Sequence, residues 1–321
     1  MSRVLVTGGA GFIGHALCPA LQAAGLDVAV ATRHPRDAEK LRGVDVRSIP
    51  GVGLGTDWSA ALRDVDAVIH LAARVHVMRD NAADPLSEFR RVNTEGTQRL
   101  VQDAIALGVA RFVYVSTIKV NGEATAPGRA FRADDEPAPI DPYAVSKLEA
   151  ETIFRDLAAQ GGMDAVVVRP PLVYGPHVKG NFLTLLESCD RNPWLPLGAV
   201  RNARSLISAG NLADLLVRCL LKPDAAGHVF LARDGEDLST PELIRRTARA
   251  LGRKAHLLPV PAGFLRLAGA LTGRADSIAR LTESLVIDDT ETRAVLDWTP
   301  PFSVDEGLGQ TAEWFHRRHL R

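Results

Sequence analysis

Short apolar runs rich in β-branched residues recur along the first half of the chain, with amphipathic stretches between them. Such runs predict strands that are buried on both faces of a sheet. They cover Arg3–Thr7, Val28–Ala31, Val44–Ile49, Asp66–Leu71, Arg111–Ser116 and Val166–Arg169. Helical patterns cover Phe12–Ala24, Trp58–Arg63, Pro85–Leu107 and a helix that begins at Asp141-Pro142. This alternation predicts an α/β fold with a doubly wound parallel sheet, whose ligands lie at the carboxyl ends of the strands.

Three glycines, Gly8, Gly11 and Gly14, stand between the first strand and the first helix. Glycines at such a turn let the backbone approach a pyrophosphate, and the helix N-terminus offers free N–H groups to it. The spacing is G-x-x-G-x-x-G rather than the commoner G-x-G-x-x-G. We expect a Rossmann-type dinucleotide site here, with a purely structural turn as the alternative. The cofactor contacts expected around this edge are Gly8, Gly11, Phe12, Ile13, Gly14, Arg33, Leu71, Ala72, Ala73, Asn93, Tyr143, Lys147 and Pro170.

The end of the second strand bears on which dinucleotide binds. NAD-binding units of this kind usually carry an acidic residue there, which holds the ribose 2′-hydroxyl. Here Thr32 occupies that position and Arg33 follows it. A cation without an acid would accept a 2′-phosphate, so NADP is favoured over NAD. NAD stays open, because Arg33 could instead face solvent or stack on adenine.

The pattern changes after Arg169, where two prolines close the last strand of the first half. Short helical pieces and loops follow, and then a strand, a helix and a strand over Ser205–Ser208, Asn211–Leu221 and Gly227–Leu231. The remainder is mainly helical or irregular and ends in a basic tail. We expect a dinucleotide-binding domain over 1–168, to which the chain returns near 205–236. A smaller, mixed C-terminal substrate-binding subdomain would cover 169–204 and 237–321.

Composition narrows the classes of partner. Lys and Arg together number 38, as do Asp and Glu, so no excess charge points to nucleic acid or to a membrane. Cys18, Cys189 and Cys219 lie far apart in apolar surroundings, which predicts neither a disulfide framework nor a metal site. The segment Phe264–Leu271 is apolar but short and contains Arg266, so we do not expect it to span a membrane. No charged and apolar leader precedes the first strand, so the expected location is cytoplasmic.

Tyr143 and Lys147 are one turn apart on a predicted helix and so share a face. A phenol with its usual pKa of about 10 is a weak base at neutral pH. A neighbouring ammonium and the positive nicotinamide ring would favour the phenolate. A hydroxyl at the end of the fifth strand, Ser116 or Thr117, could hold the oxygen of a carbinol or ketone. These groups would move a proton while the cofactor moves a hydride.

Six motifs of the chain are highly specific in combination. They are Thr7-Gly-Gly-Ala-Gly-Phe-Ile-Gly14, His70-Leu-Ala-Ala73, Asn93-Thr-Glu-Gly-Thr97, Val115-Ser-Thr-Ile-Lys-Val-Asn-Gly122, Tyr143-Ala-Val-Ser-Lys147 and Arg169-Pro-Pro-Leu-Val-Tyr-Gly-Pro176. With them the chain resembles, over nearly its whole length, the extended short-chain dehydrogenase/reductases that act on nucleotide sugars. The resemblance implies that Thr117, Tyr143 and Lys147 are catalytic and that Asn93 supports the site near the cofactor. It also implies a homodimer, in which the Asn93 and Tyr143 helices form a four-helix bundle with their copies. The apolar stripe Leu148, Thr152, Phe154 and Leu157 would allow this contact, and packing of that face within one chain is the alternative.

The resemblance extends to the substrate site. It implies that Asn181-Phe182 contacts the nucleotide sugar and that Arg204 binds its diphosphate, with Arg280 as a second, more loosely aligned phosphate contact. The expected substrate-binding residues are Arg74, Thr117, Lys119, Asn181, Phe182, Arg204 and Arg280. A surface ion pair is the alternative role for Arg204, and a helix cap is the alternative for Asn181. Whether the nucleotide is UDP or dTDP stays open, although the resemblance favours UDP.

Two departures from the family pattern bear on the reaction. Ile118 and Lys119 stand where 4,6-dehydratases of the family carry Asp-Glu, which argues against dehydration. Asn121 replaces the usual aromatic before Gly122. The run around Asn121, with Arg74-Val-His76-Val-Met78, resembles a subgroup from bacterial surface-polysaccharide pathways.

We therefore expect a 4-ketoreductase that uses NADPH on a UDP-4-keto-6-deoxy-N-acetylhexosamine. A UDP-hexose 4-epimerase with tightly held NAD is the alternative, because it would use the same residues. A non-catalytic NADP-sensing regulator is a minor alternative, because such regulators typically lose the Tyr and Lys.

Overall fold

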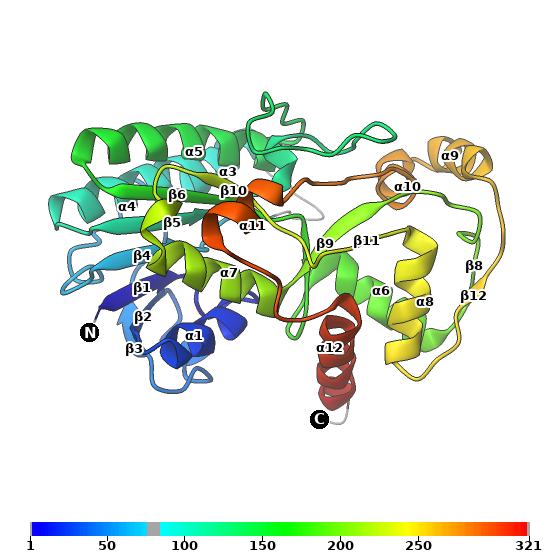
Figure 1. Cartoon of the computed structure of the whole chain (residues 1–321), viewed down its shortest axis with the longest axis horizontal. Helices are drawn as coiled ribbons and strands as arrows, with labels where there is room; N and C mark the ends of the chain where they lie inside the picture. Colours follow the sequence, from blue (N-terminus) through cyan, green and yellow to red (C-terminus); the bar gives the residue numbers. More distant parts are fainter. Residues whose placement is uncertain (1, 76–83, 320–321) are drawn as a thin grey trace.

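The computed structural model describes residues 2–75 and 84–319 (Figure 1). His76 and Met78 therefore lie outside the described residues. The larger part is a seven-stranded sheet in the order β10-β6-β5-β4-β1-β2-β3, with every neighbouring pair parallel. Its strands are β1 (Arg3–Thr7), β2 (Asp27–Thr32), β3 (Asp45–Ser48), β4 (Ala67–His70), β5 (Arg111–Val115), β6 (Asp164–Arg169) and β10 (Val229–Leu231). The predicted fold class is confirmed.

Helices cover both faces of this sheet, which is why its central strands are mainly apolar, whereas the edge strand β3 is mostly polar and exposed. Val4 and Val6 of β1 pack toward one face, with α1 (Gly14–Ala23) and α7 (Ala209–Leu221). Leu5, between them, points to the other face, with α4 (Glu95–Ala106) and α5 (Pro142–Gly161). The shorter elements nearby are α2 (Pro35–Ala38), η3 (Pro223–Ala225) and α11 (Thr290–Leu296).

Two predicted helices differ from the structure. The predicted helix Pro85–Leu107 is divided into α3 (Pro85–Phe89), a π-helical turn η1 (Arg90–Thr94) and α4. Single π turns within helices often occur at functional sites, and this one contains Asn93. The prediction of a helix over Trp58–Arg63 was wrong, because this segment forms turns. The Trp58 side chain is fully buried in the core beneath α4 and α5, so tertiary packing outweighs the local helical spacing.

The second part of the molecule has its own core. It contains a three-stranded sheet, β11-β9-β7, and a strand pair, β8-β12. These strands are β7 (Leu172–Tyr174), β8 (Trp194–Leu195), β9 (Arg204–Ser208), β11 (Asp237–Leu238) and β12 (His256–Leu257). The helices are α6 (Gly180–Arg191), α8 (Thr240–Ala250), α9 (Ala262–Leu271), α10 (Ala275–Thr282) and α12 (Val304–His319). Of the stretch 205–236, β10 joins the large sheet whereas β9 belongs to the small one. The predicted domain limits stay a prediction.

The long loop 122–141 is fixed to the second part of the chain. The amide of Thr125 donates to the Ser284 carbonyl at 2.8 Å, and that of Phe131 donates to Val286 at 2.8 Å. Leu285, which lies between Ser284 and Val286, accepts through its carbonyl from the Ser205 amide of β9 at 2.8 Å. The loop therefore joins the carboxyl end of β5 to the smaller sheet.

The helix α5 bears on the predicted dimer. Of the apolar residues expected to face a second copy, Phe154 is fully buried within the chain and Leu157 packs against the same core. Leu148 and Thr152 instead line an open hollow of about 710 Å³ on the outer side of the helix. The homodimer stays a prediction, and Phe154 takes no part in it.

Candidate active site

The glycine turn is too close to its surroundings for side chains. Gly8 has a φ of +69°, and a Cβ added there would lie 2.8 Å from the Ala72 amide nitrogen. A Cβ on Gly14 would lie 1.9 Å from the Gly9 carbonyl oxygen. Ile13, which precedes α1, makes no side-chain cap, and the amides of His15 and Ala16 donate to the carbonyls of Gly11 and Ile13 at 3.2 and 3.0 Å. Among the described residues the amides of Phe12, Ile13 and Gly14 meet no acceptor, so these N–H groups remain for a ligand. The turn therefore fits the pyrophosphate of a dinucleotide.

A buried hydrogen-bonded chain crosses the sheet edge beneath this turn. The Thr7 Oγ1 atom lies 2.5 Å from His70 Nδ1, and His70 Nε2 lies 3.1 Å from Thr97 Oγ1. Thr97 donates onward to the Asn93 carbonyl oxygen at 2.6 Å. These hydrogen bonds connect β1 and β4 to α4 and to the π-helical turn η1, which carries Asn93. His70 and Thr97 both lie inside motifs quoted above, yet the sequence alone gave neither of them a role.

The side chain of Asn93 joins the loop after β4 to α5. Its Oδ1 accepts from the Arg74 amide at 2.8 Å, and its Nδ2 donates to the Arg74 carbonyl and to Ser146 Oγ, each at 3.0 Å. Ser146 Oγ donates to the Tyr143 carbonyl at 2.7 Å. Asn93 is 1 % exposed, so this amide acts as an internal brace. Ser146 was missed as a member of the site, although it stands within the Tyr143–Lys147 motif.

The helix α5 begins where the sequence predicts. Asp141 caps it by accepting from the Ala144 amide at 2.7 Å, and Pro142 takes the first turn. Lys147, 2 % exposed, donates through Nζ to the Val115 carbonyl at 2.8 Å and lies 4.0 Å from the Tyr114 ring centroid. Burial lowers the pKa of Lys147 to about 7, and Glu151 opposes that shift.

Tyr143 is partly buried, and its ring meets the edge of Phe89 at 6.1 Å between centroids. Burial raises the pKa of the Tyr143 hydroxyl above its usual value, and the charge of Asp141 raises it further. From the sequence, Lys147 was expected to favour the phenolate. In the protein alone the opposite influences dominate, so Tyr143 is held protonated.

Thr117 and Ser116 end β5 differently. Thr117 is partly exposed and caps the short 3-10 turn η2 (Ile118–Val120), accepting from the Lys119 amide at 3.3 Å. Ser116 is 4 % exposed, and its Oγ has no hydrogen-bond partner among the residues that the structure describes. Of the two hydroxyls, Thr117 is the one that a ligand at the strand end can reach.

Lys119 is held by carboxylates. Its Nζ lies 3.1 Å from Glu123 and also forms an ion pair with Asp141. Asp141 is therefore shared between the cap of α5 and Lys119. Lys119 was expected to bind substrate; in the structure two carboxylates balance its charge, and its contact with substrate stays a prediction.

The two arginines expected at the diphosphate lie within electrostatic reach of each other. Arg204 begins β9, and its Nη1 donates to the Glu283 carbonyl at 3.1 Å. Burial is the main cause that lowers the pKa of Arg204; Glu283 opposes the shift and the charge of Arg280 adds to it. Arg204 forms no ion pair within residues 2–75 and 84–319, so the alternative of a surface ion pair was wrong.

Asn181 and Phe182 are both on α6 but face different surroundings. Asn181 is exposed, and the cap position of α6 is Lys179, so the alternative role of Asn181 as a cap was wrong. Phe182 is 2 % exposed, and its ring stacks on Tyr174 at 5.3 Å between centroids. The Phe182 side chain is a core residue, which leaves only its backbone for a substrate contact. Asn121, likewise, bonds Arg169 at 3.1 Å inside the protein, not a ligand pocket.

Residues 4–232 match the sequence model of the family described as "NAD dependent epimerase/dehydratase family". The chain belongs to this family. It is 42 % identical over 320 residues to the UDP-glucose 4-epimerase of Vibrio cholerae, covering 99 % of this chain and 97 % of that one. The resemblance to extended short-chain dehydrogenase/reductases is thereby confirmed.

Solved structures of family members share the fold. UDP-glucuronic acid 4-epimerase from Bacillus cereus in complex with NAD superposes with a TM-score of 0.78 at 22 % identity, covering 98 % of this chain and 99 % of that one. MoeE5 in complex with UDP-glucuronic acid and NAD gives 0.78 at 26 % identity, covering 99 % of this chain and 100 % of that one. These neighbours show the fold, and the family match and the 42 % identical relative show that the chain is an enzyme of the NAD-dependent epimerase/dehydratase class.

Within this epimerase/dehydratase chain, the end of β2 keeps the features read from the sequence. The Thr32 hydroxyl is occupied locally, by the amide and carbonyl of His34 at 3.2 and 3.3 Å. Arg33 is exposed and makes no ion pair with any residue that the structure describes.

Pro170, expected at the nicotinamide end, is buried, and its carbonyl accepts from the Ile118 amide at 3.0 Å.

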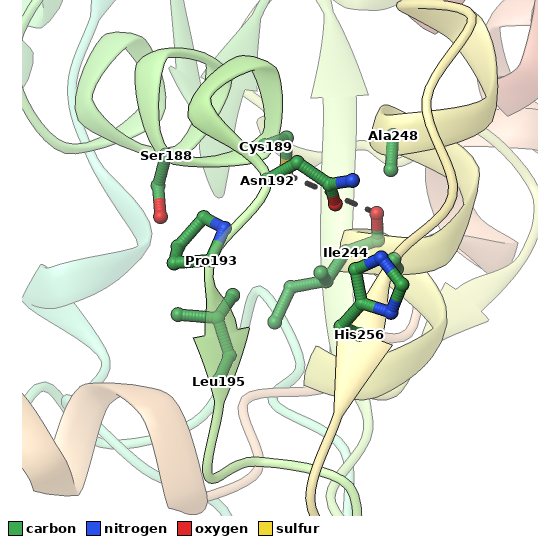
Figure 2. A pocket seen from close by; sticks show the side chains of 9 residues that line it. Ser188, Cys189, Asn192, Pro193, Leu195, Ile244, Ala248 and His256 are labelled. Atoms are coloured by element: carbon green, nitrogen blue, oxygen red, sulfur yellow. Dashed lines mark hydrogen bonds between the residues drawn. The ribbon is translucent and has the colours of Figure 1, made fainter.

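Figure 2 shows a small cavity elsewhere, between α6, α8 and the β8-β12 pair. It measures about 10 Å³, room for about one water. Cys189 lies at its wall and donates weakly to the Ile244 carbonyl at 3.9 Å. It is too small for a nucleotide sugar, and the candidate site is the sheet edge instead. Among the residues that the structure describes, no cluster could hold a metal ion and no helix could cross a membrane.

Proposed function

We propose that this protein is a 4-epimerase of UDP-hexoses. The observation that carries the proposal is the placement of Tyr143 and Lys147 on one face of α5, with Lys147 bonded to the end of β5. The strand β5 is two strands from β1, at the same edge of the sheet as the glycine turn. The 42 % identity to a protein named UDP-glucose 4-epimerase supports it. Ile118 and Lys119, in place of an acidic pair, speak against a dehydratase.

Epimerisation at C4 needs two groups from the chain: a general base that also acts as general acid, and a hydrogen-bond partner for the C4 oxygen. The nicotinamide dinucleotide, when bound, supplies a hydride acceptor for C4 of the sugar and later the hydride donor. Tyr143 takes the proton of the C4 hydroxyl as the C4–H bond breaks, which leaves a 4-keto sugar, and returns it after the sugar has turned. Thr117 would hold the C4 oxygen in both halves. Lys147 would orient the cofactor ribose and keep positive charge near the phenol.

The protonation of Tyr143 fits a cycle that starts only when the site is filled. Burial and Asp141 keep the phenol neutral in the protein alone. A positive nicotinamide ring beside it would lower the pKa of the phenol, because an opposite charge favours the anion. Proton abstraction would then be confined to the complex with cofactor and sugar.

A 4-ketoreductase acting on a UDP-4-keto-6-deoxy-N-acetylhexosamine is the second candidate. One observation favours it: Arg33 is free of ion pairs within the described part of the chain, and no acid ends β2. This favours NADP, which suits net reduction. The substrate contacts would be the same, with Arg204 and Arg280 on the diphosphate and Asn181 at the sugar.

The deciding experiment compares two assays on one preparation. UDP-glucose is incubated with the protein and NAD, and UDP-galactose is measured by chromatography. A UDP-4-keto-6-deoxy-N-acetylhexosamine is incubated with NADPH, and loss of nicotinamide absorbance is followed. Interconversion of the hexoses with no net change in nicotinamide absorbance is the expected result. Consumption of NADPH without interconversion would replace it with the reductase.

Tyr143→Phe is the variant for both assays, and Tyr174→Phe is its matched control. Tyr174 lies in the second core and donates to Asp234 at 2.6 Å, so its loss should lower stability and leave turnover. We expect Tyr143→Phe to lower kcat by about 10²–10⁴-fold. Equal activity of the two variants would contradict a catalytic role for Tyr143 and would favour the non-catalytic NADP-sensing alternative or another mechanism.

A further inference from the structure

The helix α9 is almost wholly apolar and yet almost wholly exposed. Its sequence is Ala-Gly-Phe-Leu-Arg-Leu-Ala-Gly-Ala-Leu, with Arg266 as the one charged residue. Phe264, Leu267 and Leu271 are 68 %, 59 % and 80 % exposed. They stand at i, i+3 and i+7 and so form a single stripe, called the α9 face below. Isolated exposed apolar residues are ordinary, but three large ones on one helix mark an interaction site.

The opposite side of α9 is what holds it to the protein. Leu265 is 7 % exposed and belongs to the second core. Gly269 faces α10 so closely that a Cβ there would lie 2.8 Å from Ile278 Cγ1. The helix is therefore docked along one side only, and the α9 face is left outward. Figure 1 shows α9 at the outer end of the smaller subdomain, far from the central sheet.

Charge identifies what would cover this face. The stretch 249–282 contains six Arg or Lys residues and one acidic residue, Asp276, in a chain with no net charge; of the six, Arg253 pairs with Asp190, and Arg280 is the expected diphosphate contact. Arg266 lies on α9 itself and Arg274 follows it, both exposed. Neither makes an ion pair within residues 2–75 and 84–319. A short apolar stripe with unpaired basic residues around it is typical of a helix that lies in the plane of an anionic membrane surface.

We propose that the α9 face docks this protein on an anionic lipid bilayer, with Phe264, Leu267 and Leu271 among the acyl chains and Arg266 and Arg274 near the phosphates. A second copy fits less well. An isologous contact through this face would bring the same basic residues of both copies together. The helix would lie on the membrane rather than cross it, because ten residues are too few to span one. The composition-based expectation of no membrane partner counted charge over the whole chain and so missed this local excess.

The test is flotation of the full-length protein with vesicles. Vesicles of phosphatidylcholine alone are compared with vesicles that contain phosphatidylglycerol as well. We expect the wild type to float with the anionic vesicles and to be released by high salt. A Phe264→Gln/Leu267→Gln variant should bind the anionic vesicles at least about tenfold more weakly than the wild type. The matched control is Leu107→Gln/Leu221→Gln, which changes two residues of 50 % and 51 % exposure at the ends of α4 and α7 and should bind like the wild type.

A label gives a second readout that does not depend on a weakened variant. The three native cysteines are free and buried, so a Leu271→Cys variant can be labelled selectively with an environment-sensitive dye. Its emission should shift to the blue with anionic vesicles, and that of a label at Leu221→Cys should not. The proposal is overturned if the wild type stays unbound, if the α9 variant floats equally, or if the variant loses a dimer instead of vesicle binding.

Discussion

Thr7 Oγ1 and His70 Nδ1 lie 2.5 Å apart, and the contacts around them fix which atom donates. Thr7 Oγ1 also accepts from the Ala72 amide at 3.3 Å. Thr97 Oγ1 gives its hydrogen to the Asn93 carbonyl, so His70 Nε2 must donate to it. His70 is therefore the neutral Nε2–H tautomer, and a second proton would face a donor.

This network predicts a loss of stability in acid that is specific to His70. Burial, with Lys147 second, lowers the pKa of His70 from 6.5 to about 3. The unfolded chain thus binds more protons between these values, so stability is full above pH 6.5 and is lost as the pH falls toward 3. His70→Gln should flatten this dependence and lower the free energy of unfolding at neutral pH by about 1–3 kcal/mol. Urea unfolding across the pH series measures both.

The control for this experiment is His34→Gln. His34 is exposed at the end of β2, so its variant should keep the slope of the wild type. A slope for His70→Gln that equals the wild-type slope would contradict the neutral, buried assignment.

The second prediction concerns Asp141 and Tyr143. The charge of Asp141 raises the pKa of Tyr143, and the Oδ1 atom of Asp141 caps α5. Asp141→Asn removes the charge but keeps a good cap, since Asn and Asp cap equally well. The rising limb of kcat/KM with pH should therefore move to lower pH, because Tyr143 loses protons more readily. Release of Lys119 from one of its two carboxylates acts in the same direction.

Absorbance titration checks the same shift without turnover. The chain has three tyrosines, so a Tyr143→Phe background identifies the signal of Tyr143. Asp134→Asn is the control, since Asp134 lies exposed in the same long loop and pairs, among the described residues, with Arg132 alone. An unmoved or higher pKa of Tyr143 in Asp141→Asn would rule out the electrostatic role given to Asp141.

Local sequence predicted the elements that bury both faces or begin at a strong cap. The strand Arg3–Thr7 has the predicted limits, and α5 begins at Pro142 after Asp141, as expected. Both signals are contained in a few neighbouring residues. They also placed the glycine turn, Thr117, Tyr143 and Lys147 at one edge of the sheet, since parallel strands end together.

Features that depend on distant partners could not be read in this way. Ser205–Ser208 is a strand as predicted, but only its pairing with β7 and β11 assigns it to the smaller sheet. Lys119 meets Asp141 across the long loop, and nothing local indicates that pair. Phe182 looks the same in sequence whether it faces a ligand or Tyr174. The roles of the substrate residues stay predictions for the same reason.

The third prediction tests the paired arginines. If Arg204 and Arg280 share the diphosphate, Arg204→Met and Arg280→Met should each raise the KM for a UDP-hexose by about 10–100-fold, the value of a charge-assisted hydrogen bond. The change in kcat should be smaller, because the diphosphate is far from the reacting carbon. Calorimetry with UDP alone should show the same loss of affinity. Arg201→Met is the control, because Arg201 is exposed and lies close to Arg204 in the chain. A fall in kcat at constant KM would move these arginines out of the diphosphate site.

The fourth prediction separates the two dinucleotides at the end of β2. Arg33 is exposed and has no ion-pair partner in the described part of the chain, so a 2′-phosphate beside it would gain a charge-assisted contact that a ribose hydroxyl lacks. Arg33→Ala should therefore weaken NADPH binding by about tenfold or more and leave NADH nearly unchanged. Thr32→Asp should act in reverse, because its carboxylate accepts from a 2′-hydroxyl and repels a phosphate. Arg36→Ala, an exposed neighbour on α2, is the control. Fluorescence titration with each reduced nucleotide gives the ratio. An equal loss for NADPH and NADH would assign Arg33 to the adenine face and remove the reason to prefer NADP.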